Sequence, residues 1–190
     1  VVQYTTLLTV VMVALVATAV VQRVLGLAAS EERGLSETVL ACGVPRTRAL
    51  LAAVADAVGA GVVLLVVSGA ALAAATATQV GEDHAAGRAL VSTLTQLPGV
   101  VAAAGIAALL VGAAPRWRSL AWAVIAWSSF ARLFGGLVDM PRWAQDLSVL
   151  GHVADPWGTT HWVPLVLQLV VGLVCCGAGL AVYRRRDIPA

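Results

Sequence analysis

Residues 49–78 read ALLAAVADAVGAGVVLLVVSGAALAAATAT, and Asp56 is the single charged side chain in this stretch. A helix crosses the hydrocarbon core of a bilayer in roughly 20 mostly apolar residues, at about 1.5 Å of rise per residue. The stretch is therefore long enough to cross a membrane as one helix, with residues to spare for tilt.

Four further stretches have the same character. They cover about residues 5–27, 90–113, 120–138 and 163–183, and Pro98 and Gly99 interrupt the second of them. The sequence lacks the short segments of alternating hydrophobicity that are typical of a membrane β-barrel. It therefore predicts an all-α fold, a polytopic membrane helix bundle with five transmembrane helices.

The composition supports a membrane protein and excludes several kinds of enzyme. Of the 190 residues 60% are apolar and 12% are charged, whereas soluble domains are about 45–50% apolar and about 25% charged. All twelve cationic residues are arginines, so the chain has no lysine for a Walker A motif and is not expected to hydrolyse ATP. The three cysteines and three histidines lack metal-ligand spacing, so we expect no metal site.

The arginines predict the orientation, because cytoplasmic loops of membrane proteins are enriched in them. If the five helices alternate in direction, two arginines, Arg88 and Arg142, fall on one side. Nine fall on the other side: Arg23, Arg33, Arg46, Arg48, Arg116, Arg118, Arg184, Arg185 and Arg186. The C-terminus is therefore predicted to be cytoplasmic. The first helix would then begin outside, so we expect residues 1–190 to be a single transmembrane domain, a fragment that lacks one preceding helix.

The predicted cytoplasmic stretch 30–48 reads SEERGLSETVLACGVPRTR. Ser30 is a good N-cap, and carboxylates are favoured in the first turn of a helix, where Glu31 and Glu32 would lie. Leu35 and Val39 recur at helical spacing, which predicts a short amphipathic helix over residues 30–43. Local physics leaves open whether this helix rests on the lipid headgroups or docks with a cytoplasmic partner.

The stretch 139–162, on the predicted outer side, is too polar to span a membrane and contains Trp143, Trp157 and Trp162. Tryptophan prefers the membrane interface, and Pro141 is suited to the first turn of a helix. We therefore expect an outer interfacial or re-entrant helix without chemistry of its own.

Two charges lie inside predicted spans, where charged groups are costly and mark functional sites by default. Asp56 and Arg132 are therefore candidates for the translocation path. The alternatives are that Asp56 is close enough to the cytoplasm to be hydrated, and that Arg132 extends outward toward Asp139.

Several motifs resemble those of a known transporter family. The run EERGLSETVLA at residues 31–41, followed by VPRTR at 44–48, resembles the cytoplasmic loop of bacterial ABC-type antibiotic-export permeases. Later motifs resemble that family in the same order: Leu97-Pro98, GAAPR at 112–116, FGG at 134–136, GHV at 151–153 and YRRRDI at 183–188. The chain is most similar to the C-terminal half of polyketide-antibiotic exporters of the tetronasin type.

This resemblance implies a permease half of six helices, of which the five predicted spans are helices two to six. It implies that residues 30–43 form a coupling helix and that residues 139–162 form a re-entrant hairpin. It also implies that the other permease half is fused upstream, and that a separate ATP-binding-cassette ATPase, itself a dimer, binds ATP and Mg²⁺; this chain needs no cofactor. The residues expected to contact that ATPase are Glu31, Glu32, Arg33, Leu35, Glu37, Val39, Arg46 and Arg48.

The sequence therefore predicts the transmembrane permease subunit of an ATP-driven ABC exporter of antibiotics and hydrophobic drugs. Its expected location is the bacterial plasma membrane, and its expected partners are lipid and an amphipathic drug, with no nucleic acid. Two alternatives remain. One is a proton-coupled secondary transporter that uses Asp56 as the carrier, and the other is a non-transporting membrane scaffold.

Overall fold

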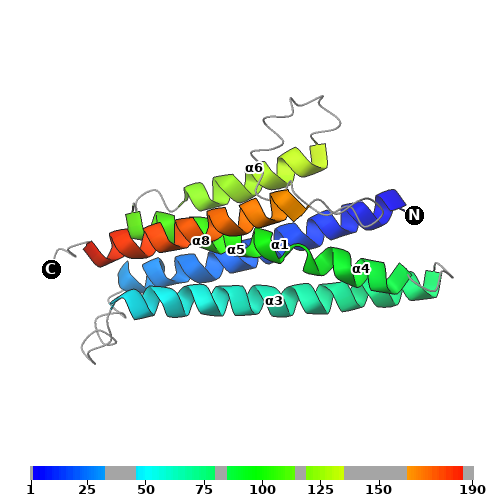
Figure 1. Cartoon of the computed structure of the whole chain (residues 1–190), viewed down its shortest axis with the longest axis horizontal. Helices are drawn as coiled ribbons and strands as arrows, with labels where there is room; N and C mark the ends of the chain where they lie inside the picture. Colours follow the sequence, from blue (N-terminus) through cyan, green and yellow to red (C-terminus); the bar gives the residue numbers. More distant parts are fainter. Residues whose placement is uncertain (1, 33–45, 80–84, 114–118, 135–161, 186–190) are drawn as a thin grey trace.

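A computed structural model of the chain describes residues 2–32, 46–79, 85–113, 119–134 and 162–185, and these residues form six helices without a strand. The helices are α1 (Val2–Glu32), α3 (Arg46–Gln79), α4 (Ala85–Leu94), α5 (Leu97–Ala113), α6 (Leu120–Phe134) and α8 (Trp162–Arg185). All six described helices run lengthwise along the molecule, and α4 leads into α5 in the same direction (Figure 1). Helices α1, α3, α5, α6 and α8 alternate in direction along the chain (Figure 1). The prediction of an all-α helix bundle is confirmed.

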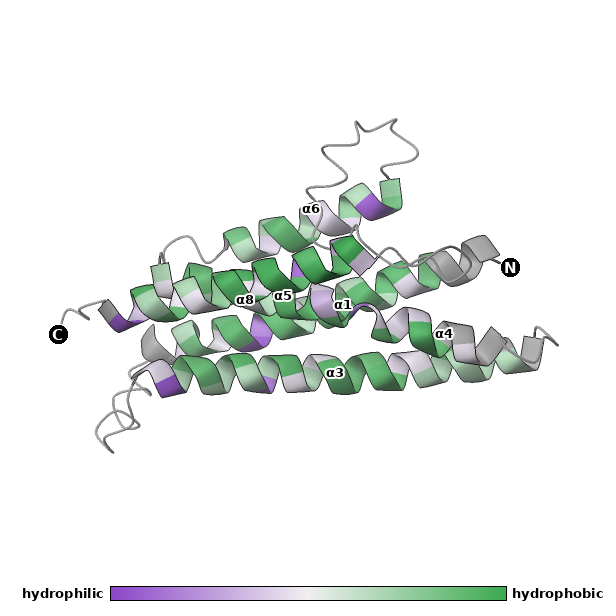
Figure 2. Ribbon diagram, viewed as in Figure 1, coloured by the Kyte–Doolittle hydropathy of each residue, from purple (hydrophilic) through white to green (hydrophobic). Residues whose placement is uncertain are grey.

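Four helical stretches are long and apolar enough to cross a membrane: Leu7–Ser30, Thr47–Ala75, Leu90–Ala113 and Trp162–Arg184. They coincide with four of the five predicted spans, and their ribbons are hydrophobic along most of their length (Figure 2). The remaining predicted span corresponds to α6, a shorter apolar helix that ends at Phe134. The predicted continuation of that span, residues 135–138, lies outside the described residues.

The predicted interruption near Pro98 is a break between α4 and α5 at Thr95 and Gln96. Proline lacks the N–H that would bond to the carbonyl four residues earlier, and its ring clashes with that carbonyl. The chain therefore ends α4 at Leu94 and restarts at Leu97, which places Pro98 in the first turn of α5, where a proline is tolerated.

The break leaves the Ser92 carbonyl without its usual helical partner. The Gln96 N–H donates to Thr93 O at 3.1 Å instead of to Ser92 O. The Thr95 hydroxyl donates to Ser92 O at 2.8 Å, and the Gln96 side-chain amide reaches the same oxygen at 3.4 Å. Since Ser92 and Gln96 are buried, these side chains satisfy a backbone group that water does not reach.

Helix α5 is the centre of the bundle, because it contacts α1, α3, α6 and α8. Its buried residues are alanines and glycines, together with Val100 and Val111. They pack with Val20 and Val24 of α1 and with Leu65 of α3 in one hydrophobic core. Such small side chains let neighbouring helices approach closely, as membrane helices commonly do.

Helix α1 ends later than the sequence predicted. Ser30 lies inside α1 and its hydroxyl donates to Leu27 O at 2.7 Å, so it does not cap a new helix. A serine in a helix commonly satisfies its hydroxyl on a carbonyl of the preceding turn, which lets α1 continue through Glu31 to Glu32. The rest of the predicted coupling helix, residues 33–43, and the predicted outer helix lie outside the described residues.

Candidate functional site

An ion pair joins α1 and α3 within the apolar part of the bundle. A guanidinium nitrogen of Arg23 lies 2.7 Å from a carboxylate oxygen of Asp56. Arg23 precedes the end of its apolar stretch, Ser30, by seven residues, and Asp56 follows the start of its stretch, Thr47, by nine residues. At about 1.5 Å per residue, both side chains begin roughly 10–13 Å inside the helix ends.

This pair lies on the outside of the bundle. The side chains of Arg23 and Asp56 are 51% and 61% exposed, although a charge at membrane depth is expected to face protein or water. The sequence placed Asp56 in the translocation path but took Arg23 for a flanking cytoplasmic residue. Arg23 stands four residues before the end of the predicted span 5–27, and that depth is the signal that could have identified it.

The second predicted path residue, Arg132, lies in the last turn of α6 and is half-buried. Since α3 and α6 run in the same direction (Figure 1), the last turn of α6 and the first turns of α3 are at opposite ends of the bundle. The structure therefore does not bring Arg132 and Asp56 together, in agreement with their different depths in the sequence. Asp139, the alternative partner of Arg132, lies outside the described residues.

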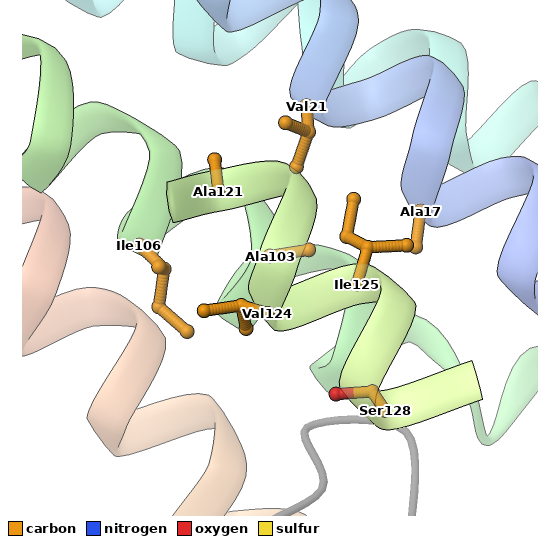
Figure 3. Close-up of a pocket in the computed structure, with 8 residues that line it drawn as sticks. All are labelled: Ala17, Val21, Ala103, Ile106, Ala121, Val124, Ile125 and Ser128. Carbon is orange, nitrogen blue, oxygen red and sulfur yellow. The ribbon is translucent and has the colours of Figure 1, made fainter. Parts of the chain in front are cut away.

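A small, partly open pocket lies between α1, α5 and α6. Its lining is apolar except for Ser128, which is 1% exposed to solvent. Figure 3 shows the eight lining residues, Ala17, Val21, Ala103, Ile106, Ala121, Val124, Ile125 and Ser128. The lining has the apolar character of ligand pockets, with Ser128 as its polar residue.

The structure describes four of the eight residues that are predicted to contact the ATPase. Glu31 and Glu32 end α1, and Arg46 and Arg48 lie in the first turn of α3, so these two pairs flank residues 33–45. The two helices contact each other, and their flanking ends lie at the same end of the bundle (Figure 1). Arg33, Leu35, Glu37 and Val39 lie outside the described residues.

Within the described ranges no group of three or more histidine, cysteine or acidic side chains is placed to hold a metal ion. Cys175 and Cys176 are half-buried and unbridged in α8. All three histidines of the chain fall outside these ranges.

Comparison with known proteins gives two matches. The family described as the C-terminal domain of the multidrug efflux system permease Rv1217c matches residues 1–184. The multidrug efflux system permease protein Rv1217c of Mycobacterium tuberculosis is 32% identical over 161 residues, which are 83% of this chain and 29% of that protein. The chain thus spans less than a third of the length of this relative. With its bundle of apolar helices, the chain belongs to the family of the C-terminal domain of the multidrug efflux system permease Rv1217c.

Proposed function

We propose that this chain is part of the transmembrane permease of an ATP-driven ABC exporter that moves antibiotics and other hydrophobic drugs out of a bacterial cell. The relative that bears the name of a multidrug efflux permease supports the transport role. The coupling to an ATPase rests on the resemblance of residues 31–48 to the cytoplasmic loop of ABC-type export permeases. In this proposal the chain sits in the plasma membrane with its C-terminus in the cytoplasm.

The observation that carries the coupling role is the arrangement of α1 and α3 around residues 33–45. Both flanking ends are charged, with Glu31 and Glu32 on α1 and with Arg46 and Arg48 on α3. Charged groups at the rim of an interface guide a partner to its site and fix its register. An ATPase subunit that binds residues 33–45 could therefore displace α1 and α3 together.

The contacts of α1 with other helices would transmit such a displacement into the bundle. α1 packs on α3, α5 and α6, and its residues Ala17 and Val21 line the apolar pocket. A displacement of α1 would therefore change the shape of this pocket. We assign the pocket to an apolar part of the drug and ATP hydrolysis to the ATPase subunit, because the chain has no lysine for a Walker A motif.

The coupling role is tested by reversing three charges together, Glu31→Arg, Glu32→Arg and Glu37→Arg, in the full-length permease. We expect this variant to lose co-purification of the ATPase subunit and to lose drug efflux. The matched control reverses Glu82→Arg and Asp83→Arg, which are predicted to lie on the other side of the membrane, and should keep both. Unchanged ATPase recruitment and efflux in the triple variant would refute the coupling role.

The two rival functions make different predictions. A proton-coupled transporter would lose efflux when the proton gradient is collapsed while ATP is maintained, and Asp56→Asn would abolish its transport. The exporter proposed here keeps efflux under that treatment and loses it when ATP is depleted. A scaffold would show no drug-dependent phenotype when the gene is deleted, so measuring efflux in a deletion strain separates it from both transporters.

A further inference from the structure

The ion pair between Arg23 and Asp56 is incompletely covered by the described part of this chain. Half or more of each side chain is exposed, yet both residues lie within apolar stretches long enough to cross a membrane. Lipid tails cannot solvate charges, and even a neutralised pair retains strong local dipoles that need polar surroundings. The face of α1 and α3 that carries the pair is therefore a surface that lipid alone does not cover well.

Glycines next to the pair add an independent observation. At five glycines of α3, α5 and α8 a Cβ would lie less than 3.0 Å from atoms of a neighbouring helix: Gly61, Gly105, Gly112, Gly172 and Gly179. Nothing lies within 4 Å of a Cβ built on Gly26 or Gly59. Gly87 and Gly177 are equally open but are far along the chain from the pair, so it is the position of Gly26 and Gly59 beside the two charges that matters here. Each follows a charged residue by three positions, Arg23 in α1 and Asp56 in α3, and therefore lies on the same face of its helix.

The two open glycines lie on both sides of the pair along the helix axes. Because α1 and α3 run in opposite directions (Figure 1), Gly26 lies nearer the helix ends than Arg23, and Gly59 lies deeper in the bundle than Asp56. Small residues let two helices approach until their backbones touch. The face thus combines a polar centre with two points of possible close approach.

The side chains around the pair favour a helix over a water-filled route. The exposed neighbours of Asp56 on α3 are the apolar Ala52, Ala55 and Val63, whereas a wet channel would be expected to carry polar groups there. On α1 the exposed Gln22 adjoins Arg23 and supplies a hydrogen-bonding group beside the pair. A helix with small residues opposite Gly26 and Gly59, and with a polar side chain opposite the pair, fits both the shape and the charge. Its polar side chain would exclude lipid from the ions and hydrogen-bond to them.

We propose that the face formed by Arg23, Gly26, Asp56 and Gly59 is the docking surface for a transmembrane helix from the part of the permease that this chain does not include. The relative at 32% identity has more than two thirds of its length outside the aligned region, which is ample chain to supply such a helix. This inference goes beyond the proposed function, since it needs neither an ATPase nor a drug.

The test measures what surrounds Gly59 in the full-length permease reconstituted in lipid vesicles. A spin label is attached at Gly59→Cys after Cys42, Cys175 and Cys176 are replaced by alanine. Its collision rates with oxygen, which concentrates in lipid, and with a water-soluble nickel chelate are then measured. A label at Val54→Cys, a partly buried position of α3 that packs against the core, gives the reference for a protein-covered site, and a spin-labelled phospholipid gives the reference for lipid.

If a helix covers this face, the Gly59 label collides rarely with both reagents, as the Val54 label does. Oxygen collisions at the level of the lipid reference would overturn the proposal, and so would frequent collisions with the nickel chelate, which would indicate a water-filled route. The same measurement at Ala55→Cys, an exposed position on the same helix, serves if the Gly59 variant does not fold. Because neither drug nor ATP is present, the outcome is independent of whether the exporter proposal is correct.

Discussion

Gly105 of α5 and Gly172 of α8 touch through their backbones. A Cβ on Gly172 would lie 2.8 Å from the Cα of Ala102, and a Cβ on Gly105 would overlap the carbonyl of Gly172. Seven residues further along both helices, Gly112 and Gly179 repeat the same contact. Because the two glycine pairs follow the same order along both helices, α5 and α8 run parallel. Positions seven residues apart lie on the same face of a helix, so both contacts fall on one face of α5 and one face of α8.

Replacing Gly172 should therefore destabilise the protein. Gly172→Ala places a methyl group against the α5 backbone, which cannot rotate away as a side chain can. Overpacking of this kind costs about 1–3 kcal/mol, or more where backbones must separate. We expect a lower midpoint of thermal unfolding in detergent. Gly177→Ala, on the same helix with nothing within 4 Å of its Cβ, is the matched control and should keep or raise the midpoint, because alanine favours a helix more than glycine does. Equal midpoints for the two variants would contradict the close contact.

Gly61 of α3 should show a milder effect that a second substitution relieves. Its Cβ would lie 2.6 Å from a methyl carbon of Val100 and 2.9 Å from one of Val20, so Gly61→Ala clashes with side chains instead of backbone. Val100→Ala removes the nearer methyl. We expect the double variant to be more stable than the sum of the single effects predicts, with a coupling of about 0.5–3 kcal/mol between neighbours in contact. Strict additivity in thermal or denaturant unfolding would argue against this packing.

The hydrogen bond from Thr95 to the Ser92 carbonyl should contribute to stability at the break between α4 and α5. Thr95→Val keeps the shape of the side chain and removes the hydroxyl that lies 2.8 Å from Ser92 O. Loss of one such bond costs about 0.5–1.5 kcal/mol. Thr95→Ser keeps the hydroxyl and should stay closer to the parent protein in unfolding experiments. If valine and serine have equal effects, the hydroxyl does not support the break.

Filling the pocket between α1, α5 and α6 should reduce drug efflux. Val124 lines the pocket and is half-buried, whereas its neighbour Ala123 is exposed and does not line it. In the full-length permease we expect Val124→Trp to lower efflux of large hydrophobic drugs at normal expression, because the indole occupies space assigned to the drug. Ala123→Trp adds the same bulk outside the pocket and should retain efflux. Equal efflux by the two variants would separate the pocket from transport.

The helices could be located from the sequence because the length and hydrophobicity of a span are local properties. One run of apolar residues is enough to identify a crossing, and Pro98 marks the break because a proline acts on the turn that precedes it. The end of α1 was harder to locate. Ser30 is as suitable for a helix interior as for an N-cap, since its hydroxyl can bond either to Leu27 O or to a following N–H.

The candidate site was predicted only in part for a different reason. Asp56 stood out in the sequence because a lone carboxylate in an apolar run is conspicuous, but its partner Arg23 lies 33 positions away in another helix. Which side chain lies beside Asp56 depends on how α1 and α3 pack side by side, and the sequence does not contain that information. The pocket near Ser128 could not be predicted from the sequence, because the residues that line it come from three separate helices.

The sequence alone determined that apolar helices cross a membrane, where they begin and end to within a few residues, and that they alternate in direction. Only the tertiary structure decided that α8 packs against α5 through Gly172 and Gly105, and that Arg23 pairs with Asp56. The physical reason is that lipid tails are as apolar as leucine side chains. A membrane helix is therefore apolar on all sides, and its sequence does not predict which side packs against a neighbouring helix. The packing face is decided by the fit of shape and charge between segments that are distant in the sequence.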